Sequence, residues 1–195
     1  MDEVMVKGAF LRGYRAALES LGMYAMVLER VSPRVRDALM TPPPTSAWVE
    51  YALCEEILRA VEKERGMIGV RKLGHDAVTA GVAPFMQIFV QGLLRLFGVS
   101  PATIFTHMNR VAGQTTRGMG YTYVPTSEFA GLVTVSLPSR KTAVDTTVWY
   151  ASAGGLSIVF DTCNVVGHVQ EPVVVPDGHS NAAQFRVSWS GKAAR

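Results

Sequence analysis

The sequence contains only two cysteines among 195 residues, Cys54 and Cys163, and they form no CxxC pair. Two isolated thiols cannot supply the disulfide framework that is typical of small secreted domains. The first residues, MDEVMVKG, also lack the basic and apolar regions of a signal peptide. Both absences predict a cytoplasmic protein.

The chain carries little excess charge, because 19 Lys and Arg residues face 16 Asp and Glu residues, for a formal net charge of +3. Proteins that bind nucleic acid usually gather a stronger basic excess on one face. Basic residues here lie beside acidic ones, as Arg34 and Arg36 lie beside Asp37. The sequence therefore predicts solvated helix faces and no nucleic-acid partner.

The motifs of common catalytic and nucleotide-binding sites are missing, including G-x-S-x-G, the P-loop and G-x-G-x-x-G. The pair His75-Asp76 is a potential source of metal ligands, but a metal needs three or four convergent ligands. The other histidines, His107, His168 and His179, lie in unrelated contexts. We expect His75 to start a helix, and we expect no metal, no cofactor and no enzymatic activity.

The longest apolar stretch, GVAPFMQIFVQGLLRLFG at residues 81–98, is interrupted by Pro84, two glutamines and Arg95. A membrane helix needs about 20 apolar residues, and a central Arg costs roughly 3 kcal/mol, so a membrane span is disfavoured. On a helix, two neighbouring faces are apolar and the polar line consists of Gln87, Gln91 and Arg95. The pattern predicts a buried helix with a narrow polar stripe.

Helical periodicity dominates residues 1–115. Gly22 stands where a left-handed C-terminal cap of a first helix belongs, and the Ser-Pro pairs at 32–33 and 100–101 are typical helix starts. After the proline-rich TPPPTS run, an amphipathic helix is expected to end at Gly66. The first part of the chain is therefore predicted to be mainly helical.

The pattern changes to alternation near residue 118, which predicts strands around YTY, VTVSL, PVVV and QFRVSW. The segment 145–163, DTTVWYASAGGLSIVFDTC, fits either a hairpin or a helix in which each of two glycines costs about 1 kcal/mol. Local propensity favours the hairpin. We expect a single domain over 1–195, with a helical part at 1–115 and a sheet-containing part at 118–190.

This order of elements resembles the superfamily that joins haem NO-binding domains, four-vinyl-reductase-like sensor domains and TRAPP-like vesicle-tethering subunits. The stretches VKGAFLRGYRAAL, VSPRVRDAL, SAWVEYALCEEIL and RKLGHDA are similar, more narrowly, to a set of paralogous, uncharacterised myxobacterial proteins. The resemblance implies an α+β fold in which a helix at 145–163 splits an antiparallel sheet into two strand pairs (ββαββ). It places Gly154 at the small position of that helix.

The resemblance covers nearly the whole chain, but it does not extend to the superfamily's haem and metal motifs. Haem NO-binding domains hold the haem propionates with a Tyr-x-Ser-x-Arg run, whereas this chain has SLPSR, with Leu137 two residues before Ser139 and Arg140 directly after it. Four-vinyl-reductase-like domains often hold a metal with paired cysteines, and Cys163 has no downstream partner. The expectation is a module that binds neither haem nor metal.

The function predicted from the sequence is a non-enzymatic small-molecule-binding or sensory module with an apolar cavity for a small apolar or acidic ligand. The alternative is a protein-interaction or scaffold subunit, and a homodimer is expected in either case. The expected ligand-binding residues lie on the 84–97 helix and in the 145–163 segment: Phe85, Phe89, Gln91, Arg95, Trp149 and Tyr150. For Arg95 two interpretations stay open, since it either reaches water or pairs with a carboxylate such as Asp161, or it receives the acidic group of a ligand or partner.

Overall fold

The structure is a computed structural model that describes residues 3–98, 100–138, 145–177 and 180–193. Its helices are α1 (Gly8–Ser20), α2 (Tyr24–Arg30), α3 (Pro33–Met40), α4 (Ala52–Ala77), the π-helix η1 (Val78–Val82), α5 (Ala83–Phe97), α6 (Pro101–Thr106), α7 (Met108–Ala112) and α8 (Thr146–Cys163). Its strands are β1 (Met5–Lys7), β2 (Trp48–Glu50), β3 (Thr116–Arg117), β4 (Gly120–Ser127), β5 (Ala130–Pro138), β6 (Val165–Val169), β7 (Val173–Asp177) and β8 (Ser180–Ala193).

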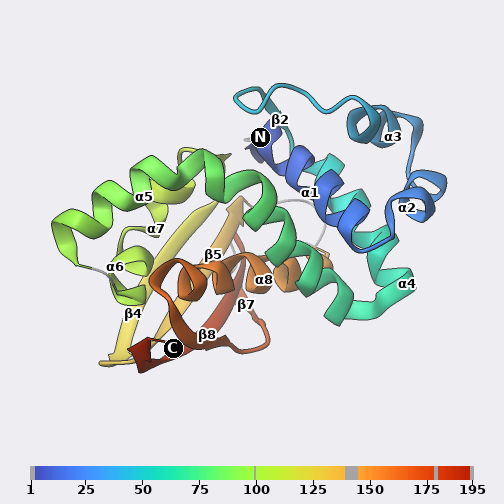
Figure 1. Ribbon diagram of the computed structural model, residues 1–195. Helices are drawn as coiled ribbons and strands as arrows, with labels where there is room; N and C mark the ends of the chain where they lie inside the picture. The colour runs from blue at the N-terminus through green and yellow to red at the C-terminus, as the bar shows by residue number, and fades with distance from the viewer. Residues whose placement is uncertain (1–2, 99, 139–144, 178–179, 194–195) are drawn as a thin grey trace.

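The main sheet is antiparallel and is covered by helices on one face (Figure 1). Its strand order is β4-β5-β8-β6, and β7 pairs with β8 on the same side as β6. Helix α8 lies across the sheet, α4 packs along α8, and α1 to α3 lie beyond α4, away from the sheet. The predicted α+β class with a helix between strand groups is confirmed, and the structure adds β6 as a third strand after that helix.

Helix α8 forms where local propensity favoured a hairpin. Its two glycines form no turn, and Gly154 instead lets α8 approach α4: a Cβ atom added at Gly154 would overlap the carbonyl oxygen of Arg71. The contact is reciprocal, because a Cβ atom on Gly74 of α4 would overlap the carbonyl oxygen of Ala151. The helix expected from the resemblance is therefore confirmed, and the hairpin is wrong because the glycines serve helix packing.

The predicted helix ends follow local capping chemistry. Ser32 and Ser100 accept hydrogen bonds from the amides of Val35 (3.4 Å) and Ala102 (3.2 Å) and so begin α3 and α6. Gly22 has φ +67°, as expected after α1. Gly66 leaves the helical conformation at φ 62°, so the predicted break at Gly66 is confirmed, and a second helical segment follows this kink and continues to Ala77.

Helices α4, η1 and α5 follow one another without a loop. On α5 the predicted polar stripe of Gln87, Gln91 and Arg95 is exposed, Val90 packs partly buried against the core, and Leu96, expected on an apolar face, is 80% exposed. Helix α5 contacts η1, α6 and α7. Within the described part of the chain, the helices are too short or too polar to cross a membrane.

A small antiparallel sheet in the order β2-β1-β3 was not expected from the sequence. It joins three distant segments, since Met5 pairs with Glu50 and Val6 pairs with Thr116. The ring of Trp48 on β2 contacts the charged groups of Lys7 and Arg117, each of which lies 4.0 Å from the ring centroid. This sheet ties the N-terminus to the region where the helical part meets the main sheet.

Candidate functional site

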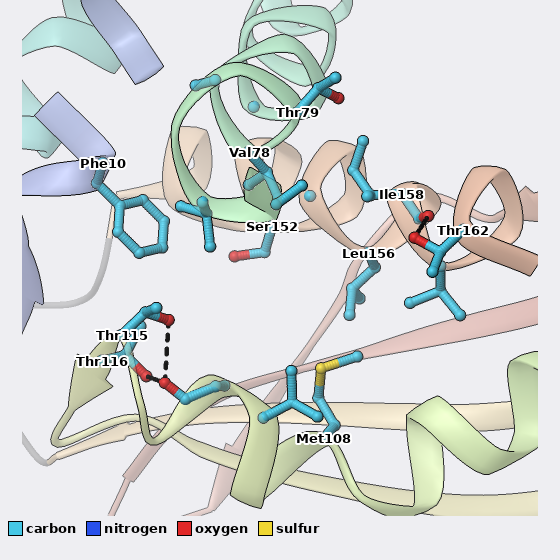
Figure 2. Close-up of a pocket in the computed structure, with 18 of the residues that line it drawn as sticks. Phe10, Val78, Thr79, Met108, Thr115, Thr116, Ser152, Leu156, Ile158 and Thr162 are labelled. Carbon is cyan, nitrogen blue, oxygen red and sulfur yellow. Dashed lines mark hydrogen bonds between the residues drawn. The ribbon is translucent and has the colours of Figure 1, made fainter. Parts of the chain in front are cut away.

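A cavity of about 520 Å³ lies between the helices and the β3–β4 region. In Figure 2, Val78, Ser152 and Leu156 face Met108 and Thr116 across it, and Phe10 lies at one end. The lining residues come from α1 (Phe10, Tyr14), the start of α4 (Tyr51), the α4–η1–α5 run (Gly74, Ala77, Val78, Thr79, Val82, Ala83, Pro84, Gln87, Val90, Gln91), α6 to β4 (Ile104, Met108, Val111, Ala112, Thr115, Thr116, Met119, Tyr121) and α8 (Ala151, Ser152, Gly155, Leu156, Ile158, Val159, Thr162). The volume falls within the range of small-molecule sites, roughly 300 to 1,000 Å³.

The described residues that line the cavity include no Asp, Glu, Lys, Arg, His or Cys. Their polar groups are the hydroxyls of Ser, Thr and Tyr and the amides of Gln87 and Gln91. Because a buried charge without a partner costs several kcal/mol, such a wall favours an uncharged ligand. It offers neutral hydrogen-bonding groups on an apolar surface.

All five Ser and Thr hydroxyls among the described lining residues already donate to backbone carbonyls. The bonds run from Thr79 to His75 (3.0 Å), Thr115 and Thr116 to Ala112 (3.1 Å each), Ser152 to Val148 (2.8 Å) and Thr162 to Ile158 (2.8 Å). The pair of bonds to Ala112 is drawn in Figure 2. These hydroxyls therefore offer only their lone pairs to a ligand.

Three tyrosines in the wall were missed as site residues by sequence analysis. Burial raises the pKa values of Tyr14 and Tyr51, and it raises that of Tyr121 to about 12. All three are therefore protonated at neutral pH and can donate a hydrogen bond. The helical spacing of Tyr14 indicated a core position, and the signal that could have identified it is the hydroxyl that a core tyrosine must satisfy.

Of the site residues expected on α5, Gln91 lines the cavity. The side chains of Phe85 and Phe89 lie outside the described part of the structure. Arg95 is exposed and is not among the lining residues. Asp161, its expected carboxylate partner, instead accepts from Nε2 of His75 at 2.9 Å.

The two aromatic site residues expected on α8 are not among the described lining residues of the cavity. Trp149 is 1% exposed and belongs to the hydrophobic core, and Tyr150 is partly buried against that core. Trp189 also packs in the core, 6.3 Å from Phe105 between ring centroids. The structure thus brings Gln91 to the cavity and leaves these rings in packing positions.

His75 lies in the last turn of α4, so the expectation that it starts a helix is wrong. Its Nδ1 lies 3.0 Å from Asp76 and its Nε2 lies 2.9 Å from Asp161 of α8. Burial alone would lower its pKa, but the hydrogen bonds and charges of both aspartates outweigh burial and raise the pKa. His75 joins α4 to α8, and no three His, Cys, Asp or Glu side chains in the described ranges are grouped as for a metal ion.

The haem that the resemblance implies does not fit the cavity as described. A haem needs an axial ligand such as His or Cys and partners for two propionates. Neither His nor Cys, Lys nor Arg occurs among the described lining residues. Ser139 and Arg140, which stand where the family's propionate motif would be, lie outside the described residues.

No family model and no curated protein matches the chain. Solved structures do. A T. tengcongensis H-NOX mutant superposes with a TM-score of 0.63 at 13% identity, over 97% of this chain and 100% of that one. The Fe(II) unliganded H-NOX protein from K. algicida gives 0.62 at 9% identity, over 97% and 99%. An oxygen-binding H-NOX domain related to soluble guanylate cyclases gives 0.61 at 13% identity, over 97% of both. The chain therefore has the fold of the haem NO-binding, or H-NOX, domains.

Proposed function

We propose that the chain is a non-enzymatic small-molecule-binding or sensory module that holds its ligand in the apolar cavity. The observation that carries the proposal is the cavity itself, about 520 Å³ in volume and without a charged side chain among its described lining residues. Fold neighbours that include an oxygen-binding H-NOX domain support a sensor of small molecules. The absence of catalytic motifs in the sequence supports binding without chemistry.

The ligand that suits this wall is uncharged, largely apolar and able to form a few hydrogen bonds. An acidic ligand, the other class expected from the sequence, would need a cation, and the described wall offers none. Haem carries two propionates and an iron that needs a ligand, so the same wall disfavours it. A lipophilic molecule of drug-like size uses both the apolar surface and the neutral polar groups.

The test places a bulky side chain in the cavity and measures whether the protein loses its binding of a neutral fluorescent probe, Nile red. Ser152 projects into the cavity from α8 (Figure 2), so Ser152→Phe should place an aromatic ring within the free volume and obstruct it. Ser157 on the same helix is not a lining residue, so Ser157→Phe is the control. Nile red fluorescence should rise with wild type and with Ser157→Phe and stay low with Ser152→Phe.

Native mass spectrometry of the freshly purified protein should show a co-purified neutral molecule that Ser152→Phe lacks. The proposal fails if Nile red binds wild type and Ser152→Phe equally, or if it binds neither wild type nor the control. Circular dichroism of both variants confirms that they are folded.

The second candidate function, a protein-interaction subunit, is favoured by one surface. Val166 of β6 and Val173 and Val174 of β7 are 55 to 63% exposed, and both strands lie on the same side of β8. We propose that this sheet edge supports the expected homodimer. Sedimentation at tens of micromolar, which would saturate a Kd of about 1 μM, should show a dimer that Val173→Lys weakens.

A further inference from the structure

The small sheet gathers polar groups at one side of the cavity. Tyr51 follows β2 directly, and its amide donates to the carbonyl of Val4 at 2.9 Å. On the other side of β1, Thr116 pairs with Val6. Tyr51 and Thr116 therefore lie on opposite sides of β1, two strand spacings of about 4.8 Å apart across the sheet and offset by two residues along it.

Tyr14 and Tyr121, which belong to other elements, line the same cavity as Tyr51. Tyr14 belongs to α1, Tyr121 belongs to β4, and both line the cavity with Tyr51. Negative charge on Tyr14 or Tyr121 would hinder ionisation of Tyr51, although burial is the larger reason for its raised pKa. The three hydroxyls therefore lie within electrostatic reach of one another.

Two of these hydroxyls have a proton to offer. Tyr121 donates to Sδ of Met119 at 3.5 Å. Tyr14 and Tyr51 donate to no residue that the structure describes, although they are only 4% and 5% exposed and face the cavity. Neither hydroxyl is among the fully enclosed polar atoms without a partner, and both residues line the cavity, so an acceptor within the cavity can reach them.

We propose that Tyr14 and Tyr51 form a donor pair that binds the carbonyl oxygen of an uncharged ketone, quinone or ester in the cavity. The inference rests on the proposed function and names the ligand's polar group. A carbonyl oxygen has two lone pairs and can accept from both tyrosines, and it brings no proton of its own. A carboxylate would need a cation to offset its desolvation, and none is found among the described lining residues.

The test compares two ligands that differ only in the carbonyl. The probes are 2-acetylnaphthalene and 2-ethylnaphthalene, which have the same ring system and similar size. Binding to wild type is measured by competition with Nile red. The ketone should bind roughly three- to tenfold more tightly than the hydrocarbon, as expected for one or two net hydrogen bonds.

The double variant Tyr14→Phe/Tyr51→Phe should abolish this preference and leave binding of 2-ethylnaphthalene unchanged. Tyr24→Phe is the matched control, because Tyr24 lies outside the cavity lining and its hydroxyl donates to the carbonyl of Leu39 at 3.3 Å. The infrared band of a ¹³C-labelled carbonyl should shift to lower frequency in wild type and in Tyr24→Phe, and return toward its value in hydrocarbon solvent in the double variant.

The outcomes separate the two proposals. If the hydrocarbon binds and the ketone has no advantage, or if the advantage persists in the double variant, the donor pair is overturned and the cavity stands. If neither probe binds wild type, the proposed function fails and the donor pair fails with it.

Discussion

Replacing Gly154 with Ala would place a methyl group in the contact between α8 and α4. The added Cβ atom would overlap the carbonyl oxygen of Arg71 and would lie 2.8 Å from the amide nitrogen of His75. Both atoms belong to the backbone of α4, so no side-chain rotation relieves the overlap. The two helices must separate, and the tight contact between Gly74 and Ala151 must open with them.

The magnitude follows from two opposing effects. Adding one carbon to a well-packed core typically costs about 1 to 3 kcal/mol of stability. Because the clash here is with backbone, which cannot rotate away, we assign the upper value of about 3 kcal/mol. The change from Gly to Ala within a helix returns about 1 kcal/mol. Gly154→Ala should therefore lower the free energy of unfolding by about 2 kcal/mol, which corresponds to a fall in Tm of roughly 4 to 8 °C for a chain of this length.

The adjacent Gly155 supplies the control in the same helix. A Cβ atom there would meet only Cγ2 of Val78, at 3.3 Å, and Val78 can move into the cavity it lines. Gly155→Ala should be neutral or stabilising by up to about 1 kcal/mol. Urea denaturation followed by circular dichroism measures both variants. If Gly154→Ala unfolds within 0.5 kcal/mol of Gly155→Ala, a margin typical of surface substitutions, the close helix contact is not what the glycine provides.

Four further outcomes are expected. The pKa of His75 is raised above its ordinary value of 6.5, because its bonds to Asp76 and Asp161 outweigh burial. The stability that His75 adds is therefore complete below about pH 6.5 and is lost as the pH rises through the raised pKa. In urea denaturation measured across this pH range, His75→Gln should flatten the decline in the free energy of unfolding. Because Arg95 is exposed, Arg95→Met should change the free energy of unfolding by less than about 0.5 kcal/mol and leave Nile red binding intact. A large loss of Nile red binding would instead indicate that Arg95 contacts the ligand. Tyr123→Phe should raise stability by about 1 kcal/mol, because its buried hydroxyl has no hydrogen-bond partner among the described residues, and lower stability would contradict this. Haemin added to the protein should give no sharp, stoichiometric Soret band, and such a band would contradict the poor fit of haem to the described wall.

Much of the fold was accessible from the sequence because it depends on local chemistry. Capping at Ser32 and Ser100 and the left-handed Gly22 involve residues only a few positions apart, so pattern and propensity suffice. The strands β5 and β8 alternate in the sequence as their burial alternates in the sheet. The same local rules misjudged α8, because the reason for Gly154 lies in α4.

The candidate site was less accessible, since it depends on contacts between distant segments. The small sheet pairs β1 with both β2 and β3, and a local sequence pattern cannot predict pairing between strands so far apart in the sequence. Apolar periodicity on α5 could not reveal which side is covered, and Leu96, which the pattern placed on an apolar face, is exposed. Tyr14 and Tyr51 occupy positions that a pattern assigns to the core, and only the three-dimensional arrangement shows that a cavity lies beside them.

The π-helix η1 fixes which side of α5 faces the cavity. A π turn accommodates one residue more than an α turn, and it lies here between two α-helices that continue on either side. Deleting one residue within Val78–Val82 would restore an α-helical register and rotate all of α5 by about 100° about its axis. Gln87 and Gln91 would then turn away from the cavity while every side chain of α5 stayed chemically unchanged. The composition of this wall is thus set by a single insertion in the helix rather than by the identity of the residues that form it.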